Sequence, residues 1–220
     1  MNRRPTVLAA ITLTTVTALC LSACGNDNDD KAGDSNGKIA GAQTDKETSA
    51  APSPSGAGSA ERPKITFPSY AKNVFEYEKT GNGVKDAVLS DSTLSINAVD
   101  DAVFRGSTGT KALGFYNTDK ALSSQITYIQ GYIDAGETWI GETTYRDWKV
   151  TLSGDSQAYV SYCSDESKAF IENKKTKKVD RSPATSRSYV LYHSKLVKNA
   201  EGIWQTANVV SNRGDKTCQP

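Results

Sequence analysis

The sequence predicts an α+β domain in which two or three helices pack on one face of an antiparallel sheet. Three observations support this fold class. Apolar residues recur at helical spacing in residues 84–105 and 122–133, the spacing changes to every second residue after Gly136, and turn residues separate the alternating segments. Helices that precede a run of strands are typical of α+β proteins.

The first helix is expected over residues 84–105, where apolar residues recur at mostly helical spacing. Arg105 lies in its last turn and Gly106 lies just past its end, as is typical of a helix C-terminus. We expect four aspartates to form the solvent-exposed face of this helix; they are Asp86, Asp91, Asp100 and Asp101. The preceding segment, residues 67–79, fits either a short helix or a packed extended arm.

A second helix is predicted from Asn117 or Thr118, either of which can cap it. Its apolar stripe follows steps of four, three and four residues, and it consists of Leu122, Ile126, Ile129 and Ile133. The helix should end near Gly136. Between the two helices, residues 111–116 show no clear hairpin pattern.

The strands are predicted from alternation of apolar and polar residues. One strand is expected around residues 148–152, and a turn at residues 153–155 joins it to another at residues 158–162. Two more are expected at residues 189–197 and 203–210, separated by a turn. Such segments are typical of long antiparallel strands joined by hairpins.

Residues 1–23 are predicted to be an export signal. Arg3 and Arg4 give a positive start, a mostly apolar run extends to Leu21, and small residues precede Cys24. Threonines interrupt this run, whereas a membrane-spanning helix needs about 20 apolar residues. A plain secretory signal or an uncleaved anchor are the alternatives.

The four residues Leu21-Ser22-Ala23-Cys24 resemble the lipobox of bacterial lipoproteins. The resemblance implies that the Cys24 thiol carries a diacylglycerol and that cleavage makes Cys24 the first residue. Two or more lipid chains form a durable anchor. We therefore expect an extracellular protein, held on the outer face of the cell membrane by lipid.

The sequence contains four cysteines. Cys20 would leave with the signal and Cys24 would carry the lipid, which leaves Cys163 and Cys218 in an oxidising compartment. A disulfide between these two is predicted, with two free thiols as the alternative. Two cysteines and the single histidine, His193, are too few for a closed zinc site, so we expect no metal and no cofactor.

Residues 24–63 are predicted to be the lipidated cysteine and a disordered tether. From Gly25 onward the segment is rich in small and polar residues, and Ile39 is its only large aliphatic residue. Such a segment buries too little apolar surface to offset its ordering entropy. A recognition segment that folds on binding is the alternative. The single folded domain is expected over residues 64–220.

Three stretches of the domain, residues 149–163, 189–192 and 202–206, are similar to a group of small actinobacterial secreted lipoproteins of unassigned function. Members of this group have a nuclear-transport-factor-2-like (cystatin-like cone) domain. This resemblance implies a cone-like fold, with helices first and then a curved sheet of about four long strands. The matching motifs are structural, so the resemblance carries fold and location but no chemistry.

The candidate for acid–base catalysis is His193, which is the only histidine and lies in a predicted strand. A His–Asp pair inside a cone can act as acid and base, and Asp147 or Asp165 would have to lie nearby. The alternation in this strand does not decide whether His193 or its neighbours Tyr192 and Ser194 face inward. The sequence holds no nucleophile elbow, metalloprotease helix, phosphate loop or calcium loop. We therefore predict no catalytic residue.

Aromatic residues crowd the predicted strands, where they either fill the core or line an apolar pocket. The candidate pocket residues are Tyr128, Trp148, Tyr159 and His193. The strongest local charge feature consists of Lys174, Lys175, Lys177 and Lys178. It is either a solvated hairpin tip or a contact with phosphate-bearing wall polymer or anionic lipid.

The sequence therefore predicts a non-enzymatic, membrane-anchored lipoprotein that binds a partner or belongs to an envelope assembly. Its expected partners are the membrane, and a cell-wall polymer or an envelope protein. A formal net charge of +1 lacks the basic excess of nucleic-acid binders, so no nucleic acid is expected. The alternatives are a protein with a pocket for a small apolar solute, or a cone-fold hydrolase or isomerase.

Overall fold

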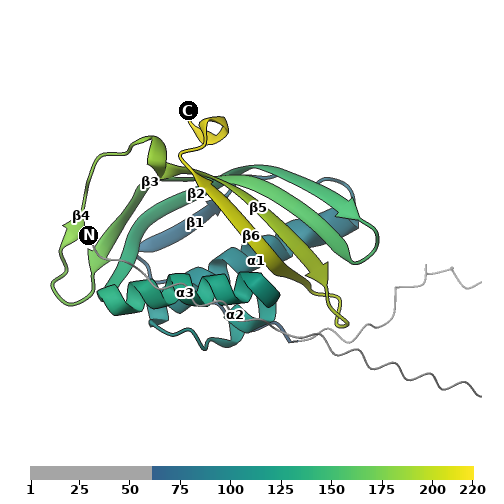
Figure 1. The fold of residues 1–220 in the computed structure, drawn as a ribbon, viewed down its shortest axis with the longest axis horizontal. Helices are drawn as coiled ribbons and strands as arrows, with labels where there is room; N and C mark the ends of the chain where they lie inside the picture. The colour runs from purple at the N-terminus through teal and green to yellow at the C-terminus, as the bar shows by residue number, and fades with distance from the viewer. Residues whose placement is uncertain (1–60) are drawn as a thin grey trace, which may run out of the picture. The chain divides into compact units, whose positions relative to one another are not determined.

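The computed structural model describes residues 61–220 (Figure 1). The predicted signal, Cys24 and nearly all of the predicted tether lie outside the described residues. Among the described residues, no helix is both long enough and apolar enough to cross a membrane.

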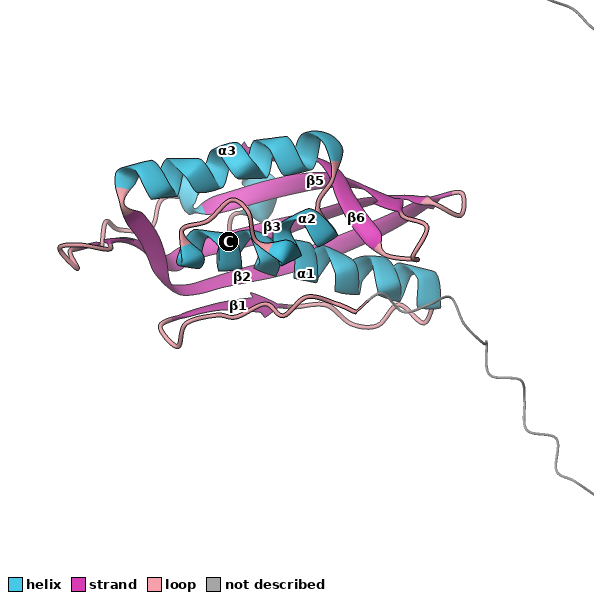
Figure 2. Ribbon diagram, turned by 90° about the horizontal axis from the view of Figure 1, so that it is seen from below, coloured by secondary structure: helices cyan, strands magenta, loops and turns pink. Residues whose placement is uncertain are grey.

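The predicted α+β class is confirmed: three helices pack against one face of an open, cone-like sheet, which curves over them (Figures 1 and 2). The helices are α1 (Gly83–Arg105), α2 (Lys111–Tyr116) and α3 (Asp119–Ala135). The strands are β1 (Ala71–Phe75), β2 (Glu137–Ser153), β3 (Gln157–Asn173), β4 (Val179–Asp180), β5 (Tyr189–Lys198) and β6 (Trp204–Arg213). Their order is β1-β2-β3-β5-β6, and β4 pairs with β3.

The sheet is mixed, whereas the sequence predicted an antiparallel one. β1 runs parallel to β2, with Ala71 opposite Gly141, so the segment around residues 67–79 is an extended arm that adds a strand. Parallel pairing needs a long crossover, and the three helices between β1 and β2 provide it. The other pairings are antiparallel, as expected.

Local signals fix the helix ends close to their predicted positions. The Asn82 side chain caps α1 by accepting hydrogen bonds from the backbone of Val84 and Lys85. Gly106 ends α1 and Gly136 ends α3, each in the left-handed conformation that glycine adopts without strain. The segment between the long helices, residues 111–116, forms the short helix α2.

Three of the four aspartates of α1 are buried, so the prediction of a solvent-exposed aspartate face was wrong. Asp91 and Asp101 are each 1 % exposed and Asp100 is 8 % exposed, whereas Asp86 is partly exposed. The reason is that α1 is covered on several sides: the sheet curves over it, α2 packs against it, and the N-terminal arm hydrogen-bonds to it through Arg62 and Thr66.

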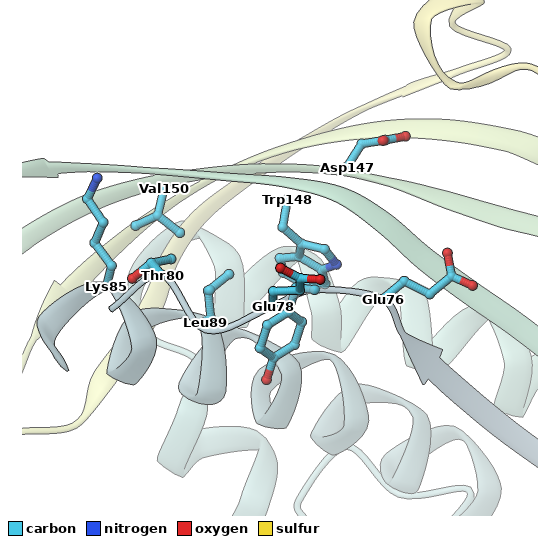
Figure 3. Close-up of a pocket in the computed structure, with 9 residues that line it drawn as sticks. Glu76, Glu78, Thr80, Lys85, Leu89, Asp147, Trp148 and Val150 are labelled. Carbon is cyan, nitrogen blue, oxygen red and sulfur yellow. The ribbon is translucent and has the colours of Figure 1, made fainter. Parts of the chain in front are cut away.

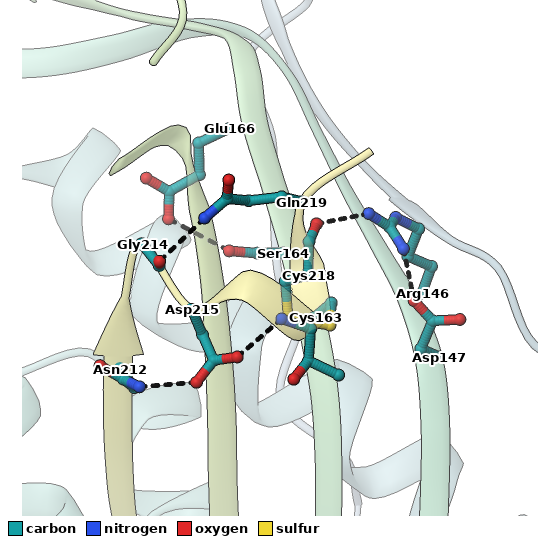
Figure 4. The surroundings of a disulfide bond; sticks show 11 residues. Arg146, Asp147, Cys163, Ser164, Glu166, Asn212, Gly214, Asp215, Cys218 and Gln219 are labelled. Atoms are coloured by element: carbon teal, nitrogen blue, oxygen red, sulfur yellow. Dashed lines mark hydrogen bonds and ion pairs between the residues drawn. A yellow bond between two sulfur atoms is a disulfide. The ribbon is translucent and has the colours of Figure 1, made fainter. Parts of the chain in front are cut away.

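Cys163 and Cys218 are joined by a disulfide (Figure 4). It fixes the C-terminal segment to β3, on the face of the sheet that points away from the helices. The Arg146 guanidinium reinforces this attachment by donating to the Cys218 carbonyl over 2.6 Å. The Asp215 carboxylate accepts from the Asn212 side chain and the Thr217 backbone, which orders the final turn.

Candidate functional site

A cavity of about 440 Å³ lies between the helices and the inner face of the sheet. α1 and α3 form one wall, and β2, β3, β5 and β6 form the other. Its polar lining residues are Ser92, Ser95, Asp100, Ser124, Gln125, Tyr128, Tyr145, Tyr162, Tyr192, Ser194, Thr206, Ser211 and Arg213. The volume falls in the range of small-molecule sites, about 300–1,000 Å³.

The Asp100 carboxyl group lies at the α1 wall of this cavity, and its donors among the described residues are all neutral. The Asn73 amide donates to Oδ2 over 2.7 Å, and the Trp139 indole donates to Oδ1 over 3.1 Å. Burial raises the pKa of Asp100 to about 7, although both donors act to lower it. Near neutral pH a substantial fraction of Asp100 is therefore protonated and able to donate a hydrogen bond.

The other two buried aspartates of α1 have different partners. Asp91 pairs with Arg62, and its second oxygen accepts from the Trp204 backbone. Asp101 pairs with Arg105 through both oxygens and also accepts from the Thr66 backbone. Both therefore have cationic partners with a structural role, whereas Asp100 faces the cavity and has no cationic partner within residues 61–220.

Tyrosine rings from three adjacent strands form the wall opposite α1. Tyr162 stacks between Trp148 and Tyr192, with ring centroids 4.4 Å and 5.1 Å apart. Because the stacked rings cover one another's faces, a ligand would meet mainly their edges and hydroxyl groups. Burial raises the pKa of both Tyr162 and Tyr192, so these phenols stay protonated.

Several polar groups that line the cavity have no hydrogen-bond partner among residues 61–220. They include the half-buried hydroxyls of Tyr145 and Tyr192 and the half-buried Gln125 amide, whereas Ser211 is exposed and Ser95 is engaged with Asn117 and Thr206. Buried polar groups are usually paired with protein or with ordered water. The unpaired groups are therefore available to water or to a ligand.

Arg213 lies at the rim of the cavity, at the end of β6. It makes a two-pronged ion pair with Glu166, with Nη1–Oε2 at 2.6 Å and Nη2–Oε1 at 3.2 Å. Nη1 also donates to the Arg187 carbonyl over 2.8 Å. Its charge is largely compensated, so the rim does not present a free cation.

The structure separates the four predicted pocket residues. Tyr128 lines the cavity, but Trp148 packs behind Tyr162 and borders a second, more open groove of about 620 Å³ (Figure 3). Tyr159, 48 % exposed, lies on the outer face of the sheet. Figure 3 shows Leu89 and Val150 beside Trp148 in that groove, whereas the Asp147 carboxylate points away from it.

His193 also lies on the outer face, exposed to solvent. Its neighbour Ser194 faces the helices and lines the cavity. The inward face of β5 is therefore the one that carries Ser194, which the alternation in the sequence did not decide. The expectation that His193 belongs to the pocket was wrong, because successive residues of a strand point to opposite faces. Among the described residues no group of three or more His, Cys, Asp or Glu side chains could hold a metal ion.

Two of the four predicted surface lysines make contacts within the chain. The Lys174 ammonium donates to the Val103 carbonyl over 2.9 Å and so caps the C-terminus of α1. Lys177 pairs with Glu172. Lys175 and Lys178 are exposed and lie in the turn between β3 and β4.

Asp100 is a site residue that was not predicted, although the sequence contains a signal for it. Asp100 lies four residues after Ile96 and three before Val103, so it interrupts the apolar stripe of α1. A carboxyl group inside such a stripe is expected to be buried and to have a shifted pKa.

No protein-family model and no curated protein matches the chain. Among solved structures, a ketosteroid isomerase-like protein from Erwinia carotovora atroseptica SCRI1043 aligns at 17 % identity with a TM-score of 0.42, covering 60 % of this chain and 97 % of its own. A putative ketosteroid isomerase from Shewanella frigidimarina aligns at 14 % identity with a TM-score of 0.32, covering 59 % and 98 %. A domain of unknown function with a cystatin-like fold from Nostoc punctiforme aligns at 15 % identity with a TM-score of 0.36, covering 61 % and 79 %. We draw no functional conclusion from similarity this slight.

Proposed function

We propose that this domain binds a small organic molecule in the cavity between the helices and the sheet. The observation that supports this proposal is a set of polar groups, on opposite walls of one cavity, that have no partner in the described part of the chain. The Gln125 amide lies on the helix wall, and the hydroxyls of Tyr145 and Tyr192 lie on the sheet wall. Asp100 lies on the same helix wall, where Asn73 and Trp139 hold its carboxyl group. Ligand sites typically combine apolar walls with a few such polar groups.

The lining favours an uncharged ligand with oxygen atoms that accept hydrogen bonds. The neutral phenols donate hydrogen bonds, and so does Asp100 in its protonated form. Among residues 61–220, the only cation of the lining is Arg213, which is paired with Glu166. An anion in the interior would lack a countercharge, and burying an unpaired charge is strongly unfavourable.

We further propose that the domain works outside the cell, on a tether attached through a lipidated Cys24. The Cys163–Cys218 disulfide supports this placement, because disulfides persist in oxidising compartments. The alternative for a protein in that location is that it belongs to an envelope assembly and binds a wall polymer or an envelope protein. It would not need the cavity.

Acid–base catalysis is a second candidate function, and Asp100 is the observation that favours it. A carboxyl group with a pKa of about 7 in a cavity can both give and take a proton near neutral pH. Asp100→Asn separates the two functions: a catalyst would lose turnover of a bound compound, whereas a binding protein has no turnover to lose.

Native mass spectrometry of the complete chain, isolated from its own cells, tests the binding proposal. We expect one small molecule bound per chain, released by organic solvent and identified in the extract. A chain that carries no such molecule, and that shows no thermal shift with a panel of uncharged oxygen-containing compounds, would contradict the proposal.

The proposed location has a separate test. We expect Cys24→Ala to release the chain from the membrane fraction, and the N-terminal peptide of the unsubstituted protein to begin with an acylated Cys24. An unmodified Cys24 within an uncleaved chain would overturn the location and leave the cavity proposal standing.

A further inference from the structure

β6 forms one edge of the sheet, above α3 in Figure 1. Its first residues are covered: Trp204 and Thr206 are buried, and the Thr206 carbonyl accepts from the Thr118 backbone over 2.9 Å. Its second half, residues 208–213, is exposed except for the half-buried Val209. In the described part of the chain, the outer edge of residues 208–212 has no backbone hydrogen-bond partner.

Natural sheets protect such edges with charges, prolines or bulges, because an open edge pairs readily with another strand. The exposed half of β6 carries one charged residue, Arg213 at its end, which is paired with Glu166. Residues 205–212 contain no charged residue and no proline, and the irregularity in the pairing of β6 lies before Asn208. The opposite edge differs, because β1 is only five residues long and carries the exposed Lys72.

The sequence of this edge is complementary to itself. In an antiparallel pairing of two copies centred on Val210, Val210 lies opposite Val210 of the second copy, and Asn208 lies opposite Asn212. Val210 is 58 % exposed and points outward, since its register partner His193 lies on the outer face. The outer side of the paired strands would then carry an apolar pair between two pairs of amide side chains.

The inner side of the same pairing is also compatible. Val209 and Ser211 line the cavity, and each would lie opposite the other in the second copy. No like charges meet on either side, and a two-fold axis places the same patch on both partners, as a closed dimer requires.

We propose that two copies of this chain associate through antiparallel pairing of their β6 strands, centred on Val210, to form one continuous sheet. This pairing joins main-chain groups that are otherwise open to solvent and places two cavities side by side. It does not depend on the cavity holding a ligand.

Cysteine cross-linking in membranes from cells that produce the complete chain tests the geometry. Directly opposed residues of antiparallel strands have Cα atoms about 4.5–5.5 Å apart, within the span of a disulfide. We expect Val210→Cys to give, on mild oxidation, a species of twice the chain mass that reductant reverses. Thr151→Cys is the matched control, because Thr151 is exposed on a strand away from this edge. Equal cross-linking of both variants, or none of Val210→Cys, would overturn the proposal.

Sedimentation of the complete chain in detergent gives the second test. We expect a concentration-dependent dimer that Val210→Lys abolishes, since the two-fold axis opposes two like charges, and that Thr151→Lys preserves. Thermal unfolding of Val210→Lys verifies that the variant is folded. The proposal would be overturned if the unsubstituted chain stays monomeric, or if it pairs only with another protein. A dimer that Val210→Lys leaves intact would also overturn it.

Discussion

The Trp139 indole nitrogen donates to Asp100 Oδ1 over 3.1 Å, joining the start of β2 to the C-terminal part of α1. Together with the Asn73 amide, this contact gives a buried carboxyl group two neutral donors and no cation. Neutral donors hold the side chain in place without compensating a negative charge. Burial therefore outweighs them and raises the pKa of Asp100 to about 7.

The raised pKa of Asp100 predicts that stability falls as pH rises from about 4 to about 7. Below pH 4 the carboxyl group is protonated in both states, whereas between these values the unfolded chain loses the proton and the folded chain keeps it. The folded state then binds more protons, so the free energy of unfolding falls with pH, by at most on the order of 4 kcal/mol. Urea unfolding at several pH values measures this slope.

Asp100→Asn should remove the part of this pH dependence that arises from Asp100. Asp134→Asn is the control, because Asp134 is exposed on α3 and should leave the slope unchanged. If Asp100→Asn and the unsubstituted domain show the same slope between pH 4 and pH 7, the assignment of a raised pKa to Asp100 is wrong.

Removal of the disulfide should destabilise the domain. The bond closes a loop across a sequence separation of 55 residues, for which the chain-entropy account gives about 4 kcal/mol. We expect the double substitution Cys163→Ser with Cys218→Ser to lower the free energy of unfolding by about this amount. Reductant alone should act slowly on the folded domain, because both cysteines are buried. Equal stability of the double variant and the oxidised domain would show that the bond does not stabilise the fold.

Two glycine substitutions should have opposite effects. Gly141, at the β2 position opposite β1, has φ of +100°, and a Cβ there would collide with the carbonyl oxygen of Lys168. Gly141→Ala should therefore cost about 3 kcal/mol or more. Gly131→Ala, inside α3 where a Cβ meets open space, should stabilise by about 0.5–1 kcal/mol. Thermal unfolding of both variants checks this contrast, and a similar effect at both positions would contradict it.

Contact with an anionic surface, if the lysine cluster makes one, should depend on Lys175 and Lys178, because Lys174 and Lys177 are engaged within the chain. We expect Lys175→Glu with Lys178→Glu to reduce sedimentation of the domain with phosphatidylglycerol vesicles by about tenfold or more, since each lysine contributes about 1 kcal/mol at such a surface. Lys149→Glu, exposed on β2, is the control. Sedimentation that depends equally on Lys149 would show a general charge effect.

Sequence patterns predicted the elements better than the surroundings of individual side chains. The helical stripes and alternating segments located α1, α3 and parts of the four long strands, because periodicity is a local property. The segments predicted at residues 148–152 and 158–162 cover only one end of β2 and of β3. The parallel addition of β1 and the burial of Asp91, Asp100 and Asp101 depend on segments distant in sequence. Cysteine counting indicated the pair Cys163 and Cys218 because only two cysteines were left to form a bond.

Sequence periodicity predicted little of the candidate site. Alternation in β5 gave two equivalent faces, and only packing against α1 and α3 shows that Ser194 faces the helices and His193 faces away. Tyr145, Tyr162 and Tyr192 come from three strands, and their convergence on Asp100 follows from the register of the sheet and the path of α1.

The occupancy of the cavity in two matched variants tests the central claim most directly. Ser124 and the adjacent Ser123 are both exposed on α3, but only Ser124 is part of the cavity lining. Native mass spectrometry of the complete chain from its own cells should find the bound molecule in Ser123→Trp and not in Ser124→Trp, because the larger side chain fills the space. The same molecule on both variants, or on neither while the unsubstituted chain carries it, would contradict binding in this cavity.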